Sequence, residues 1–174
     1  MPTDSVPRRP EPILEESYWR QRLEQARASG ELHHAIFKCP GDLWRRIEER
    51  HRQILADLVQ PSDSILDAGC GWGRLLTLLP ADWRGPYLGV DISPDFIALA
   101  KEKNPGRSFK VMDLRDLGAL PGKMADWAIL ISVRPMVNRH LGCDAWKLME
   151  AELRRVARKM LFLEYDINDK GSVI

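Results

Sequence analysis

Acidic residues and a run of glycines carry the clearest chemical signal in this sequence. The stretch SILDAGCGWGRLL, residues 64–76, places Asp67 just ahead of Gly69, Gly71 and Gly73, which occupy alternate positions. Glycines let the backbone adopt positive φ and approach a ligand closely. A helix that begins after such a turn presents unpaired N–H groups. The stretch therefore indicates a nucleotide-like ligand held against the backbone, with a bare strand-to-helix turn as the alternative.

The spacing of the glycines argues against a phosphate ligand. The dinucleotide fingerprint is G-x-G-x-x-G. Here the pattern is G-x-G-x-G, and Arg74 stands where the third glycine of the fingerprint would be. A P-loop ends in Gly-Lys-Ser/Thr, which this stretch lacks. The carboxylate of Asp67 would repel a pyrophosphate and would suit a cofactor that carries a cation.

The elements around these residues alternate in type from residue 62 onward. Short apolar runs typical of buried strands alternate with helix-like segments. We expect strands at SILDA, YLGVDI, SFKVMDL, ADWAILISV and KMLFLEY, and helices at GRLLTLLP, PDFIALAKEKN and CDAWKLMEAELRRVAR. This alternation predicts an α/β fold, with an open parallel sheet of about five strands covered by helices on both faces. Ligands bind such sheets outside the carboxyl ends of the strands.

A helical segment precedes the alternating region. Residues 1–12 contain four prolines and few apolar residues, so we expect a flexible arm. Residues 13–60 form a helical extension in which the first helix ends near Gly30 and the second has Asp42 as its N-cap. Residues 61–174 form the α/β cofactor-binding core of what we interpret as a single domain.

The composition limits the location and the partners of the chain. A length of 174 residues suits one domain, and a formal net charge of +1 provides no global attraction to nucleic acid or to an anionic membrane. Three widely spaced cysteines fit a reducing, cytoplasmic environment. The first residues have no apolar core of a secretory signal, and the run WAILISV is too short to span a bilayer.

The run ILDAGCGWG resembles motif I of the class I S-adenosylmethionine-dependent methyltransferases, which is apolar-apolar-Asp/Glu-x-Gly-x-Gly-x-Gly. S-adenosylmethionine carries an ammonium and a sulfonium and has no phosphate, which matches Asp67. In that family an acidic residue that ends the second strand takes the ribose hydroxyls, and Asp91 in YLGVDIS fits this position. An acidic residue after the third strand lies near the adenine, and Asp113 in FKVMDLRDL fits, with Asp116 as a substitute. The resemblance covers residues 62–165.

The resemblance implies a Rossmann-like sheet and a cofactor site at its carboxyl edge. Ser132 ends the fourth strand, where the methyl donor sits in the family. For Asp113, a solvated loop carboxylate is the alternative. The residues implied to bind S-adenosylmethionine are Asp67, Gly69, Gly71, Trp72, Gly73, Asp91, Ile92, Asp113, Leu114 and Ser132.

The residues that would handle the methyl acceptor are marked less clearly. Tyr18 and Trp19 resemble aromatic residues that close over the cofactor in some small-molecule methyltransferases, with helix packing as the alternative. Arg134 and His140 lie in the loop expected after the fourth strand, Arg134 as a candidate substrate contact and His140 as the candidate general base. No pair of these residues has the spacing of metal ligands, so no metal is expected.

The predicted function is methyl transfer from S-adenosylmethionine to a small-molecule acceptor, because no recognition domain for RNA, DNA or protein is attached. The alternatives are an RNA or protein acceptor and a non-catalytic S-adenosylmethionine-binding regulator or subunit. The terminal β-hairpin of the family has no room after KMLFLEY, which leaves that strand as an edge. We expect the N-terminal helices, the C-terminal tail or a second subunit, in a homodimer, to cover this edge.

Overall fold

The structure, a computed structural model, describes residues 16–166 and 170–173. The arm expected at residues 1–12 lies outside this part of the chain. Five parallel strands and one short antiparallel strand form a sheet of order β3-β2-β1-β4-β5-β6. The strands are β1 (Ile65–Ala68), β2 (Tyr87–Asp91), β3 (Ser108–Val111), β4 (Ala125–Ile131), β5 (Ala157–Leu163) and β6 (Ser172–Val173). The predicted Rossmann-like parallel sheet is therefore confirmed, and its strand order reverses direction between β1 and β4.

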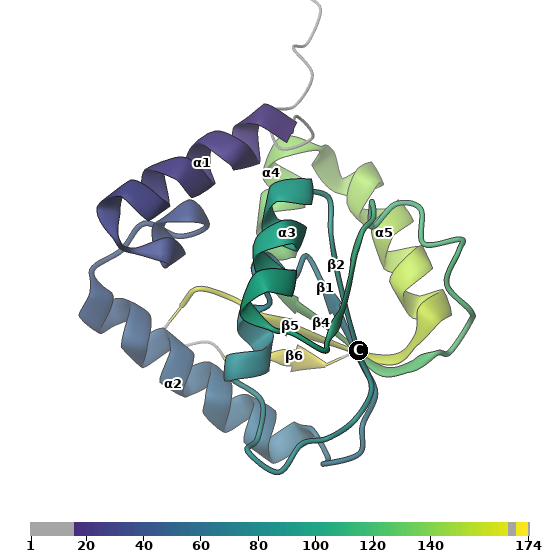
Figure 1. Cartoon of the computed structure of the whole chain (residues 1–174). Helices are drawn as coiled ribbons and strands as arrows, with labels where there is room; N and C mark the ends of the chain where they lie inside the picture. The colour runs from purple at the N-terminus through teal and green to yellow at the C-terminus, as the bar shows by residue number, and fades with distance from the viewer. Residues whose placement is uncertain (1–15, 167–169, 174) are drawn as a thin grey trace, which may run out of the picture.

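Helices cover both faces of the sheet, as expected for parallel strands (Figure 1). On one face lie α2 (Gly41–Leu58), α3 (Pro94–Lys103) and the short 3-10 helix η3 (Arg74–Thr77), packed in a common apolar cluster with β1. On the other face lie α4 (Val133–His140) and α5 (Gly142–Val156). All four residues of β1 are buried, which explains why its sequence does not alternate between apolar and polar residues and is apolar except for Asp67.

The N-terminal helix α1 (Glu16–Ser29) and the 3-10 helix η2 (Leu32–Ala35) lie against the carboxyl edge of the sheet. Trp19 packs in an apolar cluster with Trp72 of the glycine turn and Phe96 of α3. Nε of Arg22 donates to the carbonyl oxygen of Ala35 at 2.6 Å, which ties α1 to η2. Figure 1 shows α1 above the end of α3. The helical extension is therefore packed directly over the region where the sequence places the ligand.

The predicted helix ends agree with the structure in two cases and differ in one. Helix α1 ends just before Gly30, which has a φ of 74°. Ser93 caps α3 by accepting from the backbone N–H of Phe96, and Pro94 begins the helix. The N-cap of α2 is Pro40 rather than Asp42, which lies in the first turn of α2.

Two segments next to the sheet differ from the prediction. The stretch expected as a full helix at GRLLTLLP forms only the 3-10 helix η3, because Gly73 in the left-handed region and Pro80 leave too little chain for an α-helix. The loop expected after the fourth strand is helix α4 instead. Pro135 lies in the first turn of α4, where a missing N–H is tolerated.

The edge of β5 is covered by the C-terminal tail. Strand β6 pairs antiparallel with β5, Val173 opposite Leu161 and Ser172 opposite Phe162. The C-terminal tail is therefore the one of the three suggested covers that the structure shows. We expected no strand of the family's terminal hairpin, but one short strand, β6, is present. The edge through which we considered a homodimer is partly occupied, so we do not propose one. Within the described residues no helix is long and apolar enough to cross a membrane.

Candidate cofactor and acceptor site

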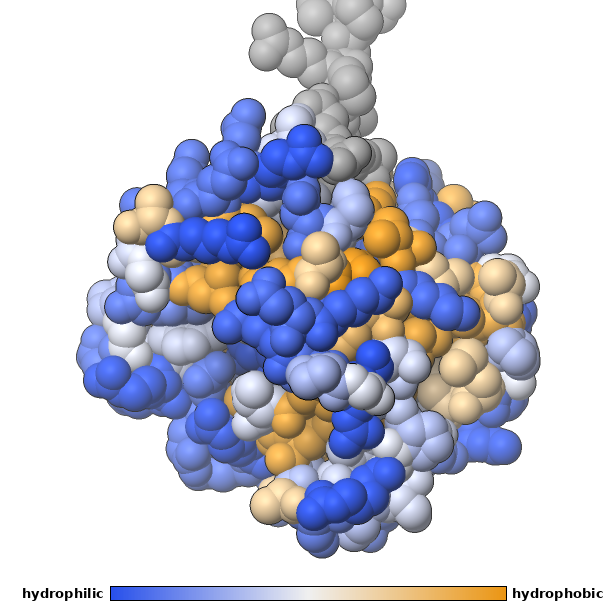
Figure 2. Space-filling model, in the orientation of Figure 1, coloured by the Kyte–Doolittle hydropathy of each residue, from blue (hydrophilic) through white to orange (hydrophobic). Residues whose placement is uncertain are grey.

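A pocket opens at the carboxyl ends of the parallel strands, where the strand order reverses. Its empty space measures about 990 Å³, part of which is open to solvent. The walls come from the residues that follow β1, β2, β3, β4 and β5, while Trp19 of α1 and Ile36 after η2 contribute from the N-terminal side. Figure 2 shows hydrophobic residues gathered in a band across this face of the molecule, below α1.

The structure brings most of the sequence-predicted site residues together at this pocket. Of the residues predicted to contact the cofactor, Gly73 does not line the pocket. Of those predicted to contact the acceptor, Trp19 lines it, whereas Tyr18, Arg134 and His140 do not. The predicted residues that line it are Trp19, Asp67, Gly69, Gly71, Trp72, Asp91, Ile92, Asp113, Leu114 and Ser132.

Two glycines of the turn serve different purposes. Gly71 has a φ of 53°, and a Cβ added there would meet nothing within 4 Å, so open pocket space lies against its backbone. Gly73 has a φ of 78°, and a Cβ there would lie 2.7 Å from Nδ2 of Asn104 and 3.0 Å from Cζ of Phe109. Gly71 therefore fits a backbone that a ligand approaches closely, while Gly73 is required by packing beneath the turn.

Asp91, the last residue of β2, is held in place by backbone hydrogen bonds. The N–H of Gly71 donates to Oδ2 at 2.8 Å, and the N–H of Ser93 donates to Oδ1 at 2.9 Å. Burial raises the pKa of Asp91, and these hydrogen bonds oppose that effect. Each carboxylate oxygen keeps acceptor capacity for a second donor. The arrangement can therefore accept two hydroxyl groups of a ligand without moving.

Asp67 lies deeper, at 3% exposure, beneath the glycine turn. The hydroxyl of Tyr87 donates to its Oδ2 at 2.6 Å. Burial raises the pKa of Asp67 to about 7, against the lowering effects of the Tyr87 hydrogen bond and of the charge on Arg74, while Asp91 adds to the rise. A carboxyl group with this pKa gains a full charge when a cation binds beside it.

Asp113 is engaged by a neighbouring arginine. Nε of Arg115 donates to both carboxylate oxygens of Asp113 at 3.0 Å, and the backbone N–H of Arg115 donates to Oδ1 at 2.8 Å. Burial alone would raise the pKa of Asp113, but the Arg115 interactions outweigh it and lower the pKa below its usual value. Asp113 is thus a charged carboxylate at the pocket wall that shares its oxygens with Arg115.

Ser132 joins the ends of two strands. It lies at a φ of 54°, a left-handed conformation that is strained for a residue with a side chain. Its hydroxyl donates to Oε2 of Glu164 at 2.9 Å and accepts from the N–H of Tyr165 at 3.1 Å. These bonds fix the segment after β5 against the end of β4 and bring Tyr165 to the pocket.

Three predicted acceptor contacts lie away from the pocket lining. Tyr18 packs edge-to-face on Trp19, with ring centroids 4.9 Å apart. The guanidinium of Arg134 lies over the ring of Phe162 at 4.9 Å. His140 is the last residue of α4. Helix α4 therefore places Val133, Met136 and Val137 at the pocket, whereas Arg134 and His140 lie outside its lining.

Sequence reasoning missed two polar residues of the pocket, Arg74 and Tyr165. Arg74 belongs to the motif stretch itself, yet nothing in the sequence indicates that its side chain turns inward. Tyr165 follows β5 and lines the pocket, where its backbone N–H donates to the hydroxyl of Ser132 and its ring packs against Trp44. The missed apolar residues come from segments far apart in the chain: Ile36, Cys70, Leu75, Phe96, Met112, Ile131, Val133, Met136, Val137, Leu141 and Met149.

The acidic and basic residues at the pocket come from different secondary-structure elements. Its carboxylates belong to the segments at the ends of β1, β2 and β3, whereas Arg74 is the one cationic residue among the described residues that line it. The described lining includes no histidine, and the described chain has no cluster of three potential metal ligands. An apolar cavity with carboxylates along one wall can hold a neutral or cationic nucleoside-like molecule.

The fold and this site define an α/β protein that binds a ligand at the switch point of a parallel sheet. Residues 65–160 match a family model described as a methyltransferase domain. The chain therefore belongs to the class I S-adenosylmethionine-dependent methyltransferase family, as the motif I resemblance predicted. No curated protein matches the chain.

Solved structures share this fold at low sequence identity. A TehB-like S-adenosylmethionine-dependent methyltransferase from Corynebacterium glutamicum is 21% identical, with a TM-score of 0.55, over 84% of this chain and 71% of the other. A Pyrococcus horikoshii protein is 26% identical, with a TM-score of 0.58, over 75% and 64%. Magnesium protoporphyrin IX methyltransferase from Synechocystis, solved with bound S-adenosylmethionine, is 21% identical, with a TM-score of 0.53, over 84% and 68%.

Proposed function

We propose that this chain transfers a methyl group from S-adenosylmethionine to a small-molecule acceptor, as one domain in which the helices of residues 13–60 cover the α/β core. The shared apolar cluster of α1, the glycine turn and α3 supports a single domain. The three cysteines, Cys39, Cys70 and Cys143, are free, which supports the cytoplasmic location that the sequence suggested.

The pocket residues fit the donor by charge and shape. We assign the ribose hydroxyls to Asp91, whose two oxygens are fixed and keep acceptor capacity. The adenine lies at Asp113 and Leu114, and the methionine end lies at Gly69 and Gly71. Asp67 supplies negative charge near the ammonium. Trp72, Ile92 and Ser132 complete the walls, and Gly73 supports the turn from behind.

We choose a small acceptor because the N-terminal region covers the pocket. Trp19 is only 8% exposed, lines the pocket and packs against Phe96 with ring centroids 5.8 Å apart. Ile36 adds a second apolar wall from the same N-terminal region. A macromolecular substrate would need this side to be open. The Synechocystis methyltransferase, by its name, likewise acts on a small molecule, magnesium protoporphyrin IX.

This pocket can contribute to catalysis by aligning the methyl donor with the acceptor and by excluding water. S-adenosylmethionine, when bound, supplies a methyl group already activated by the sulfonium. The apolar walls exclude water, and the fixed carboxylates orient the donor for in-line attack. Because no histidine lines the described pocket, we expect an acceptor that attacks without a strong base. His140 stays a candidate base for an acceptor that extends to the end of α4.

The test measures S-adenosylhomocysteine production in the presence of a library of small carboxylates, amines and thiols. We expect turnover with at least one compound and none with Asp91→Asn at the same cofactor concentration. Turnover only with RNA or protein would contradict the small-molecule assignment. Binding of S-adenosylmethionine without turnover on any acceptor would favour the non-catalytic regulator.

A further inference from the structure

Aromatic rings line the same pocket as the carboxylates. Trp19 of α1 and Trp72 of the glycine turn both line it, and they are 8% and 9% exposed. Phe96 of α3 contacts both, with its ring centroid 5.8 Å from that of Trp19 and 6.1 Å from that of Trp72. The face of an indole ring attracts a cation. The pocket therefore combines aromatic and acidic groups, and both kinds of group favour a positively charged ligand.

Core packing alone accounts for Phe96 but not for the rest of this wall. Phe96 is 1% exposed and is enclosed by the apolar cluster that α1 shares with α3. Ile36, Met136 and Leu141 pack against the same cluster, yet they remain only partly buried and line the pocket. Apolar side chains around a cavity are typical of a small-molecule site. This part of the wall therefore suits the apolar body of an acceptor.

Two of the charges at the pocket are offset by neighbouring side chains. Oε1 of Glu48 lies 3.5 Å from Nη1 of Arg74, the one cation among the described residues that line the pocket. Nε of Arg115 donates to both carboxylate oxygens of Asp113. Because each of these pairs is close to neutral, the remaining charged groups set the sign of the site.

Asp91 and Asp67 make that sign negative. Backbone N–H groups hold Asp91, and the neutral hydroxyl of Tyr87 donates to Asp67. Neither carboxyl group has a cation hydrogen-bonded to it among the described residues. An anionic acceptor would therefore be repelled, whereas a positive charge inside the pocket is stabilised by these carboxyl groups and by the indole rings.

The sulfonium of the donor makes this sign decisive for the choice of nucleophile. When an anionic nucleophile attacks, the positive charge disappears in the transition state, so the acidic and aromatic groups stabilise the ground state more than the transition state. When an uncharged nucleophile attacks, the positive charge moves from sulfur to the acceptor and stays inside the pocket. The site therefore favours an uncharged nucleophile over a thiolate, a phenolate or a carboxylate.

The lining also limits the kind of uncharged nucleophile, because its described residues include no histidine. A protonated aliphatic amine has no free lone pair and would first have to lose a proton to a base. A pyridine-like ring nitrogen is uncharged near neutral pH, has a free lone pair and has no proton to lose. Its flat, apolar ring system also suits a wall that contains Trp19, Ile36 and Met136.

We propose that the methyl acceptor is an uncharged heteroaromatic base, that the pocket converts its ring nitrogen into an N-methyl cation, and that Trp19 determines this specificity. The lone pair of the ring nitrogen forms a bond to the methyl carbon. The bond from that carbon to the sulfonium sulfur breaks, and its electron pair stays on sulfur. The ring takes over the positive charge, and no proton is transferred. The inference rests on the proposed function and deepens it.

Bicyclic probes of one shape test the preference for a cation. N-methylisoquinolinium is the product-like cation, methylnaphthalene substituted at the equivalent position is its uncharged isostere, and the corresponding naphthoate is an anion. Equilibrium dialysis measures their dissociation constants in the complex with S-adenosylhomocysteine. We expect the cation to bind at least about tenfold more tightly than the isostere, and the anion to bind most weakly. Binding of the cation no tighter than that of the isostere would overturn the inference.

Substitutions at Trp19 test the aromatic wall in the same assay. Trp19→Leu removes the ring, so we expect the preference for the cation to fall at least about fivefold, while Trp19→Phe keeps a ring and most of the preference. Retained binding of S-adenosylhomocysteine shows that a variant has folded its site. Trp146→Leu is the matched control, because Trp146 is also 8% exposed but packs against Phe162, outside the described lining. Equal preferences in Trp19→Leu and Trp146→Leu would overturn the role of Trp19.

Turnover identifies the nucleophile. Isoquinoline and the naphthol and naphthalenethiol of the same shape are each incubated with S-adenosylmethionine, and mass spectrometry detects the methylated products. We expect N-methylisoquinolinium and S-adenosylhomocysteine in equal amounts, at least about tenfold faster than methylation of the other two. Faster methylation of the naphthol or the thiol would overturn the inference and leave the proposed function intact. If none is methylated, the binding preference for the cation decides; if the folded wild type binds no S-adenosylhomocysteine, the proposed function itself fails.

Discussion

Two sides of the pocket are built in contrasting ways. The carboxylate side, Asp67, Asp91 and Asp113, comes from β1, β2 and the residues after β3, in chain order and on neighbouring strands. The arginine side, Arg74 with Trp44 and Tyr165, combines η3, α2 and the segment after β5. The first side follows from the repeated βαβ pattern, whereas the second exists only once distant segments have folded together. The contrast separates what a local motif encodes from what tertiary structure adds.

The largest expected effect lies on the carboxylate side, at Asp91. Asp91→Asn removes the charge and one acceptor oxygen while keeping the side-chain shape near Gly71 and Ser93. We expect S-adenosylhomocysteine to bind about 100-fold more weakly in calorimetry, because charge-assisted hydrogen bonds to the ribose are lost. Asp116→Asn is the control, since Asp116 follows the same strand as Asp113 but does not line the pocket. Equal losses in both variants would contradict the assignment of Asp91.

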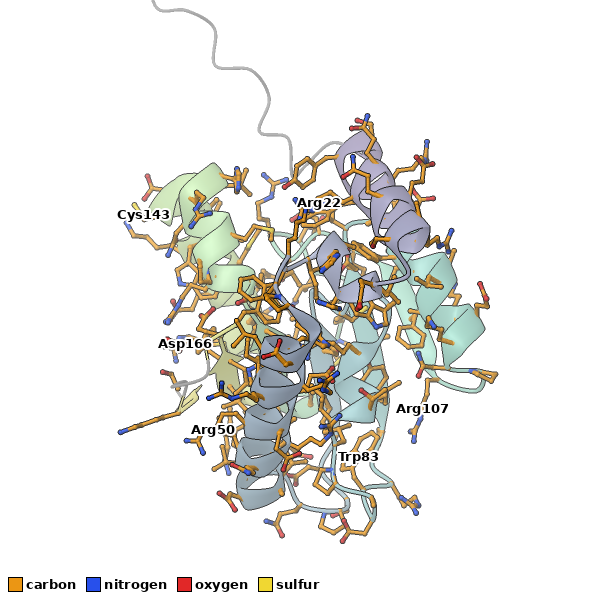
Figure 3. All side chains as sticks on the ribbon, turned by 90° about the vertical axis from the view of Figure 1, so that its left-hand side faces the viewer. Arg22, Arg50, Trp83, Arg107, Cys143 and Asp166 are labelled. Atoms are coloured by element: carbon orange, nitrogen blue, oxygen red, sulfur yellow. The ribbon has the colours of Figure 1, made fainter. Side chains whose placement is uncertain are left out.

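The carboxylate side could be predicted because its signals are local. Asp67 and the glycines form one continuous stretch, and Asp91 ends an apolar run that reads as a buried strand. Arg74 differs from these residues. Its type and position could be read from the sequence, but the burial of its side chain depends on α2 lying over η3. The bond from His51 Nε2 to the carbonyl oxygen of Glu164, 2.9 Å long, joins residues more than a hundred positions apart in the chain. Figure 3 shows α2 and the segment that ends at Asp166 on the same side of the molecule.

The fold shows the same division between local and distant information. The parallel strands and the end of α1 at Gly30 follow from periodicity and from a residue that favours a left-handed conformation. Helix α4 was expected to be a loop, and Pro135 is compatible with this helix because it lies in the first turn. Strand β6 was missed because its two residues gain strand structure from pairing with β5 rather than from their own sequence.

The glycines offer a second way to separate binding from folding. Gly71→Ala places a methyl group in open pocket space, so we expect about tenfold weaker S-adenosylhomocysteine binding and a stability loss of about 1 kcal/mol from the positive φ. Gly73→Ala places a methyl group against Phe109 and Asn104, so we expect a larger loss, about 2–4 kcal/mol, in urea unfolding. The reverse order of stability losses would show that Gly71, not Gly73, is the packed position.

The pKa of Asp67 predicts a pH dependence of cofactor binding. Burial holds this pKa at about 7, and the ammonium of the cofactor favours the charged carboxylate. Affinity for S-adenosylhomocysteine should therefore rise as pH increases from about 5.5 to about 7, by up to about tenfold. Tyr87, Arg74 and Asp91 are the groups that influence this titration. In Asp67→Asn we expect a flat profile, and likewise for the wild type with 5′-methylthioadenosine, a nucleoside thioether that lacks the ammonium. A rise in either would assign the titration to another group.

The smallest expected effect concerns the pair between Asp113 and Arg115. The side chains are 28% and 36% exposed, and an ion pair of this exposure contributes less than about 1 kcal/mol. We expect Arg115→Ala to change S-adenosylhomocysteine affinity by less than about threefold, because Asp113 remains available to the adenine. A loss comparable to that of Asp91→Asn would place Arg115 itself in the binding site.

The central claim is that S-adenosylmethionine binds at the carboxyl edge of the sheet, with its ribose on Asp91. A crystal structure of the wild type with S-adenosylhomocysteine tests it most directly. We expect both ribose hydroxyls within hydrogen-bond distance of the Asp91 carboxylate, and the methionine end against Gly69 and Gly71. Electron density for the ligand elsewhere on the protein, or in the pocket with the ribose away from Asp91, would contradict the claim.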